Sequence, residues 1–198
     1  LNLRAEIGMP DRLTRFLIEG TIQLGLLYMP QLRPGLAVEK VMDEDLVLVA
    51  SWPNPTLDVG DRYVFVDWGP EFVSAHAAVL PDLTNPGMTF ALGAMVAEYV
   101  INRQAAAYLP ARYVKKYLDS GQLHLVPDAP AFPYPVWAVW REDLDPDILS
   151  AAKQVLAQVG QNAETDGNAV LGSLRALSED VADENTDIKT DRQSLADT

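Results

Sequence analysis

The chain has 198 residues, no cysteine, 48% hydrophobic residues and a net charge of −13. This length and apolar content indicate a folded chain with one large domain or two small lobes. The absence of cysteine excludes disulfides and thiolate metal sites, the acidic balance lacks the footprint of a nucleic-acid-binding surface, and no apolar run reaches the roughly 18 residues of a transmembrane helix.

The first fifty residues predict a strand, a helix and three further strands. Residues 1–7 alternate apolar and polar side chains, which is typical of a strand with one buried face. A helix is expected over 11–19, and it is short enough to connect two parallel strands. The expected strands after it cover 22–28, 38–41 and 46–50. Because the chain opens on Leu1 inside a strand-like pattern, we expect it to be a fragment.

A second block of alternating elements follows residues 51–55, where two prolines favour an extended crossing between lobes. Its first strand, 63–66, ends in a turn that contains Gly69 and Pro70. An apolar segment comes next at 75–80, and both histidines, His76 and His124, fall within or beside predicted apolar strands. The other expected elements are a helix over 89–102, a strand over 105–109, a helix over 111–119 and a strand over 123–126.

Four prolines in residues 127–135 predict a second, semi-rigid crossing. A strand is expected over 136–140, and a final helix begins after a capping Asp145 and ends at Gly160. Residues 161–198 carry nine acidic and three basic residues and no aromatic residue. This composition predicts a mostly disordered acidic tail with one weak helix around 169–181, because it offers little apolar area to offset the entropy of ordering.

Catalytic motifs are absent from the sequence. No Gly-rich phosphate loop, GxSxG or HExxH pattern occurs, and two histidines without cysteine predict no metal and no cofactor. Asp67 and Glu71 are a candidate acid–base pair, but that role also needs a pocket and a placed substrate. The turn that holds them leaves two interpretations open, since Trp68 and Phe72 could pack on the core or contact a ligand. Two α/β lobes with extended crossings favour a binding module rather than an enzyme.

An ordered series of five segments over the first 160 residues carries a family resemblance. The segments are EIG at 6–8, GLAVEKVMDEDLVLVAS at 35–51, VDWGPEF at 66–72, YVINRQAAAYLPARYV at 99–114 and SGQLHLVPDAP at 120–130. Together they resemble the effector-binding domain of LysR-type transcriptional regulators. The resemblance implies an α/β, two-lobed fold like the type 2 periplasmic binding proteins. Lobe I would comprise 1–50 and 134–160, and lobe II would comprise 51–133.

The resemblance also implies a function. A small-molecule effector would bind between the lobes and change how a homodimer or homotetramer grips promoter DNA in the cytoplasm, with no membrane partner. This chain lacks the family's N-terminal helix-turn-helix and the first strand–helix unit of lobe I, so any DNA contact would come through the missing domain. A solute-binding receptor of a transporter, which shares the fold, is the alternative.

Family positions can be carried over one residue at a time. Where many members place a hydroxyl group on the ligand, this chain has Met9. Where the family commonly has a Gly-x-Gly turn, it has Arg103-Gln104-Ala105. Arg103 could read a negative charge on the effector or cap its helix. The expected effector-binding residues are Met9, Tyr28, Asp67, Trp68, Phe72, Asn102 and Arg103.

Overall fold

The computed structural model describes residues 4–84, 86–91 and 93–196. It divides the chain into two compact units, each built from two separate stretches. Unit 1 comprises residues 1–44 and 133–165, and unit 2 comprises residues 45–132 and 166–198. The first boundary therefore falls near residue 44 instead of residue 50, because strand 45–50 pairs within the sheet of unit 2.

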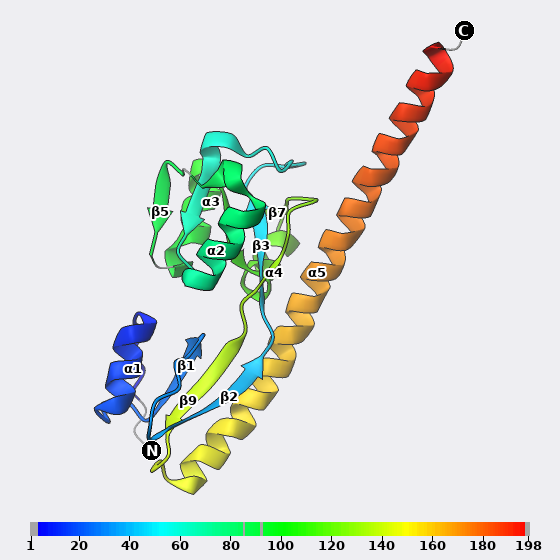
Figure 1. Ribbon diagram of the computed structural model, residues 1–198. Helices are drawn as coiled ribbons and strands as arrows, with labels where there is room; N and C mark the ends of the chain where they lie inside the picture. The colour runs from blue at the N-terminus through cyan, green and yellow to red at the C-terminus, as the bar shows by residue number, and fades with distance from the viewer. Residues whose placement is uncertain (1–3, 85, 92, 197–198) are drawn as a thin grey trace. The chain divides into compact units, whose positions relative to one another are not determined.

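Unit 1 is built on a three-stranded antiparallel sheet in the order β1-β9-β2 (Figure 1). Its central strand β9 (Val136–Arg141) pairs along its length with β1 (Leu24–Tyr28) and β2 (Leu36–Met42). Helix α1 (Pro10–Ile18) begins with proline at its first turn, where the missing N–H costs nothing. Its fully buried Leu17 packs with Leu27, Leu36 and Val139 from the sheet.

The predicted strand over 1–7 is wrong for the residues that the structure describes. Residues 4–9 form neither helix nor strand, and the Ile7 side chain is 84% exposed, while residues 1–3 lie outside the described residues. The expected crossover from this strand to a parallel β1 is therefore not formed in the described part of unit 1, where β1 pairs antiparallel with β9 instead. Alternation makes a strand only when a partner satisfies the backbone N–H and C=O groups.

Unit 2 contains a mixed sheet in the order β5-β4-β6-β3-β7, with β8 (Phe132–Pro133) paired to β3. β3 (Asp45–Ala50) is buried from Leu46 onwards, as a continuous apolar run predicts. β4 is parallel to β5 and β6, whereas β3 is antiparallel to β6 and β7. The remaining strands are β4 (Tyr63–Val66), β5 (Met88–Phe90), β6 (Ala106–Pro110) and β7 (His124–Leu125), and the helices are α2 (Pro70–Val79), α3 (Val96–Arg103) and α4 (Ala111–Asp119).

Two predicted elements of unit 2 are wrong. The apolar segment 75–80 belongs almost entirely to α2, so His76 lies on a helix and not beside a strand. α2 can begin at Pro70 because Gly69 adopts a φ of 107° that other residues avoid. The expected helix over 89–102 begins only at Val96, since backbone pairing with β4 makes Met88–Phe90 a strand.

The last helix, α5 (Pro146–Ala196), does not end at Gly160 as the sequence predicts. It begins as expected, because the Asp145 carboxylate accepts the N–H groups of Asp147 and Ile148 at 2.9 and 3.2 Å. Beyond Gly160 it continues through a tail that the sequence predicts to be mostly disordered, with one weak helix around 169–181. Val170 and Leu174 are 2% and 7% exposed there and join the core of unit 2, which provides the apolar burial that a free tail lacks. Among the described residues, no helix combines the length and apolar character needed to cross a membrane.

Gly160→Ala is expected to destabilise the protein by about 1–2 kcal/mol, although alanine favours helices. A Cβ at this buried position would lie 2.7 Å from the Val41 carbonyl oxygen, so β2 would have to move. Gly172→Ala is the matched control on the same helix. Its Cβ meets nothing within 4 Å, so we expect a gain of about 0.5–1 kcal/mol. Urea unfolding measures both, and equal gains would contradict the close packing at Gly160.

Candidate functional site

The turn after β4 places Asp67 at the carboxyl end of a strand that has parallel neighbours on both sides. Its backbone N–H donates to the Phe90 carbonyl at 2.9 Å, and its carboxylate accepts the Gly69 N–H at 3.0 Å. The side chain is otherwise exposed. In open α/β sheets this end of the strands is where ligands bind, so Asp67 offers an exposed carboxylate at a suitable place within unit 2.

Trp68 is held by unit 2 itself. Its indole N–H donates to the Tyr108 carbonyl at 2.9 Å, and its ring packs against the core of the unit. The ring also lies against Gly93, where a Cβ would come within 2.7 Å of Cζ2 and Cζ3 of the indole. The indole N–H and much of the ring therefore serve to attach the turn to the sheet.

Phe72 lies in what we call the aromatic cluster. The ring is 5% exposed, and its centroid lies 5.2 Å from that of Phe132 and 5.7 Å from that of Tyr108, both in edge-to-face geometry. These contacts favour the packing interpretation of Phe72. The aromatic cluster comprises Tyr63, Phe65, Phe72, His76, Tyr108 and Phe132.

His76 is the buried titratable group of the aromatic cluster. Its side chain is 1% exposed, and its Nε2 shares a hydrogen bond of 2.8 Å with the Tyr63 hydroxyl. Burial lowers the pKa of the imidazole and raises the pKa of the Tyr63 phenol, because each charged form would lose its hydration. The pair is therefore neutral near pH 7 and contributes to packing rather than to proton transfer.

Stability is expected to fall as the pH drops below about 6.5, the pKa of an unfolded histidine. Below that pH the unfolded chain binds a proton that the folded His76 does not, because burial lowers its folded-state pKa. The free energy of unfolding, measured at about pH 7.5 and about pH 5.5, should decrease more in the wild type than in His76→Gln. An equal decrease in the two proteins would show that other groups cause the pH dependence.

Asn102 and Arg103 form the last residues of α3. The Asn102 amide donates to the Glu98 carbonyl at 2.8 Å, and the chain leaves the helix through Gln104 at a φ of 49°. Both side chains are exposed. A cation in the last turn stabilises the carbonyl end of a helix, and the same exposure leaves Arg103 accessible to an anion, so both predicted roles fit its position.

The two candidates in unit 1 differ in accessibility. Met9 precedes α1, is 49% exposed and accepts the Leu13 N–H through its carbonyl at 3.1 Å. Tyr28 is the last residue of β1, opposite Val136, and is partly buried. Its ring stacks on Tyr134 with centroids 3.9 Å apart and an angle of 17° between the planes. Within unit 1, the Tyr28 ring therefore packs on Tyr134, whereas the Met9 side chain is about half exposed.

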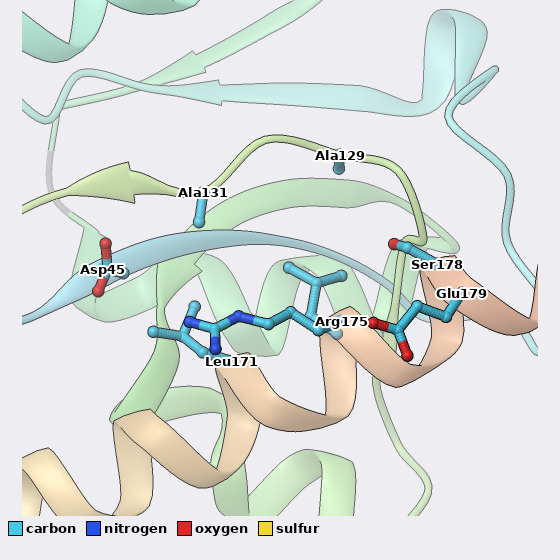
Figure 2. A pocket seen from close by; sticks show the side chains of 8 residues that line it. Asp45, Ala129, Ala131, Leu171, Arg175, Ser178 and Glu179 are labelled. Atoms are coloured by element: carbon cyan, nitrogen blue, oxygen red, sulfur yellow. The ribbon is translucent and has the colours of Figure 1, made fainter.

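A surface pocket of about 530 Å³ lies in unit 2, at a place that the sequence did not predict as a site (Figure 2). One wall is the stretch of α5 from Leu171 to Glu179, where the sequence predicts only a weak helix within a mostly disordered tail. The signal that could have found it is the helical spacing of Val170, Leu174, Leu177 and Val181, which marks one face of a helix. In the described parts of the chain, no group of three or more His, Asp or Glu residues could hold a metal ion.

The chain is similar to a known protein family and to solved structures. Among curated proteins, no sequence matches it significantly. The regulatory domain of HypT from Salmonella typhimurium (apo-form) is similar in structure, with a TM-score of 0.59 and 13% identity over 84% of this chain and 79% of that one. The reduced OxyR regulatory domain from Pseudomonas aeruginosa has a TM-score of 0.58 and 15% identity over 75% and 78%.

DarR from Vibrio fischeri, solved in complex with DNA, has a TM-score of 0.63 and 15% identity over 77% of this chain and 56% of that one. At these identities, the likenesses establish the fold, which is the two-lobed α/β fold expected from the sequence. The model of the family described as "LysR substrate binding domain" matches residues 1–162, and so most of the 198 residues. The chain therefore belongs to the LysR substrate-binding domain family, the effector-binding part of LysR-type transcription regulators.

Proposed function

We propose that this chain senses a small-molecule effector for a LysR-type regulator and passes the signal to a helix-turn-helix domain outside the chain. The family match over residues 1–162 is the observation that carries this proposal. The family comprises regulatory domains rather than enzymes, and a structural neighbour, DarR, was solved bound to DNA. A chain with a net charge of −13 fits a sensing part better than a DNA-binding part.

The positions of six of the seven candidate residues refine their proposed roles. Asp67, Arg103 and Met9 have exposed side chains and are the ones we propose to contact the effector directly. Tyr28, which is partly buried and stacks on Tyr134, is also proposed to contact the effector. Trp68 and Phe72 would instead hold the Asp67 turn in place, because their rings contact the core of unit 2.

The upstream coding sequence tests the proposal first. A helix-turn-helix encoded before Leu1 is the expected result, and a secretory signal in its place would favour a transporter receptor. The next test uses the full-length regulator on its own promoter region. DNA affinity is measured with and without single metabolites that carry an amine, a carboxylate or an aromatic ring, and an effector should change it about 5–150-fold.

Asp67→Asn should reduce the effect of an active metabolite on DNA affinity, because it removes an exposed charge without changing the size of the side chain. Asp82→Asn, an exposed position in the turn after α2, is the matched control and should retain the full response. If both variants respond like the wild type, Asp67 does not contact the effector. If no metabolite in any class alters DNA binding, the sensing proposal fails.

We also propose that the regulator works in the cytoplasm as a homodimer or homotetramer, as LysR-type regulators form oligomers. Sedimentation velocity of the full-length protein measures this directly. A monomer at all concentrations, with unimpaired promoter binding, would contradict the proposed assembly.

A further inference from the structure

A surface groove lies in unit 2 between α5 and the segment 127–131, which we call the α5 groove. Its volume of about 530 Å³ falls within the range of small-molecule sites, roughly 300–1,000 Å³. Figure 2 shows side chains from both walls around the groove. The lining residues are Asp45, Ala129, Ala131, Leu171, Leu174, Arg175, Ser178 and Glu179.

Both walls of the α5 groove are held in place. On the helix side, Leu174 is 7% exposed and packs in the core of unit 2 together with Val170. On the opposite side, the backbone N–H of Asp128 donates to the Ser178 hydroxyl at 2.9 Å, which ties the segment to the helix. Ala129 and Ala131 present only methyl groups, so space remains between two anchored walls. The result is an apolar floor of two alanines and two leucines.

The charges of the α5 groove are arranged in opposite signs around this floor. Arg175 and Glu179 lie one helical turn apart and are both exposed, yet they form no ion pair with each other in the part of the chain that the structure describes. Figure 2 shows the Arg175 side chain extending along α5 towards Leu171, with Asp45 on the other side of the groove. The guanidinium and the Glu179 carboxylate are therefore two separate polar contacts beside one apolar surface.

These charges restrict the class of ligand. With Asp45, the lining carries two carboxylates and one guanidinium, in a chain of net charge −13, so a simple anion is repelled. A purely apolar molecule would partly desolvate Arg175 and Glu179 without offering either a hydrogen-bond partner, which is costly. A zwitterion with an apolar body satisfies both signs and also covers the floor.

We infer that the α5 groove binds a small zwitterion with an apolar side chain, of the hydrophobic α-amino-acid class. Arg175 pairs with its carboxylate, Glu179 accepts hydrogen bonds from its ammonium group, and the alanines and leucines cover its side chain. The site is separate from the family's effector residues, since none of the seven candidates lines it. Its helical wall lies beyond residue 162, where the family match ends.

Three probes that share a phenyl body test the inference on the full chain: phenylalanine, phenethylamine and hydrocinnamate. Isothermal titration calorimetry should give the tightest binding for phenylalanine, because it alone engages both Arg175 and Glu179. Removing either charge from the ligand should weaken binding by about tenfold or more, as expected for loss of a hydrogen bond to a charged group. Equal binding of the three probes, or tightest binding of either single-charge probe, would overturn the zwitterion assignment.

Two surface variants locate the binding. Arg175→Gln should weaken phenylalanine about tenfold and leave phenethylamine nearly unchanged, whereas Glu179→Gln should weaken both amines. Arg15→Gln on α1 and Asp180→Asn next to the site are matched charge controls that should bind like the wild type. Binding that is insensitive to Arg175 and Glu179, or no binding of phenylalanine up to about 10 mM, would overturn the site.

Hydrogen exchange gives an independent measurement. A ligand that bridges α5 and segment 127–131 should slow amide exchange in residues 166–182, because it stabilises the docked helix against local opening. Slowing confined to other parts of the chain would place the ligand elsewhere and refute the α5 groove. Since this experiment needs no DNA and no effector response, its failure is distinguishable from failure of the proposed sensing function.

Discussion

Phe72→Ala is expected to lower the free energy of unfolding by about 3–5 kcal/mol. The Phe72 ring is 5% exposed and contacts four other rings of the aromatic cluster, so its removal leaves a cavity between α2 and the sheet of unit 2. Urea unfolding followed by circular dichroism measures the loss. Edge-to-face contacts with Tyr108 and Phe132 add to the lost apolar burial.

Val79→Ala is the control on the same helix. The Val79 side chain is 55% exposed at the end of α2, so its truncation should change stability by no more than about 0.5 kcal/mol. Phe72→Leu, which retains most of the volume, should cost less than Phe72→Ala. If Phe72→Ala unfolds like the wild type and instead abolishes an effector response, Phe72 contacts the effector and the packing interpretation is wrong.

Gly93→Ala is expected to cost about 2–3 kcal/mol, in spite of the small size of the added methyl group. The Cβ would lie 2.7 Å from two ring carbons of Trp68, whose indole N–H is bound to the Tyr108 carbonyl. The ring must then shift and weaken that hydrogen bond. Gly87→Ala is the control, since a Cβ there meets nothing within 4 Å.

A double-mutant cycle shows whether the cost of Gly93→Ala arises at Trp68. In a Trp68→Leu background the indole is absent, so the methyl group should be tolerated and the added cost should largely disappear. Quenched or shifted tryptophan fluorescence in the single variant would report the displaced ring. An unchanged cost in the Trp68→Leu background would locate the strain elsewhere.

Both predictions bear on the function, because Trp68 and Phe72 follow the exposed Asp67 in the same short segment. If the two rings serve mainly to hold this turn, their substitution should change stability first and effector response only in proportion to the unfolded fraction. Asp67→Asn should have the opposite pattern, with a changed response and near-normal stability. Comparing the two patterns separates residues that contact a ligand from residues that support them.

The sequence by itself determined the elements whose signals are local. The apolar run at 63–66 predicts β4, and the helix expected over 111–119 is α4, which begins after Pro110 and is followed by Gly121 at a φ of 68°. The ordered segments up to residue 160 also indicated the family, which the match over 1–162 confirms. Proline, glycine and unbroken apolar runs act through neighbouring residues, so they can be interpreted without knowing the fold.

Only the tertiary structure decided the rest. Met88–Phe90 is a strand because β4 lies beside it, and Gly160 lies inside a helix at a point where β2 leaves no room for a side chain. Trp68 and Phe72 could equally have faced a ligand until the partners of their rings were known. The α5 groove depends on Val170 and Leu174 finding a core in unit 2. These outcomes rest on contacts between residues distant in sequence, and such contacts override local preference.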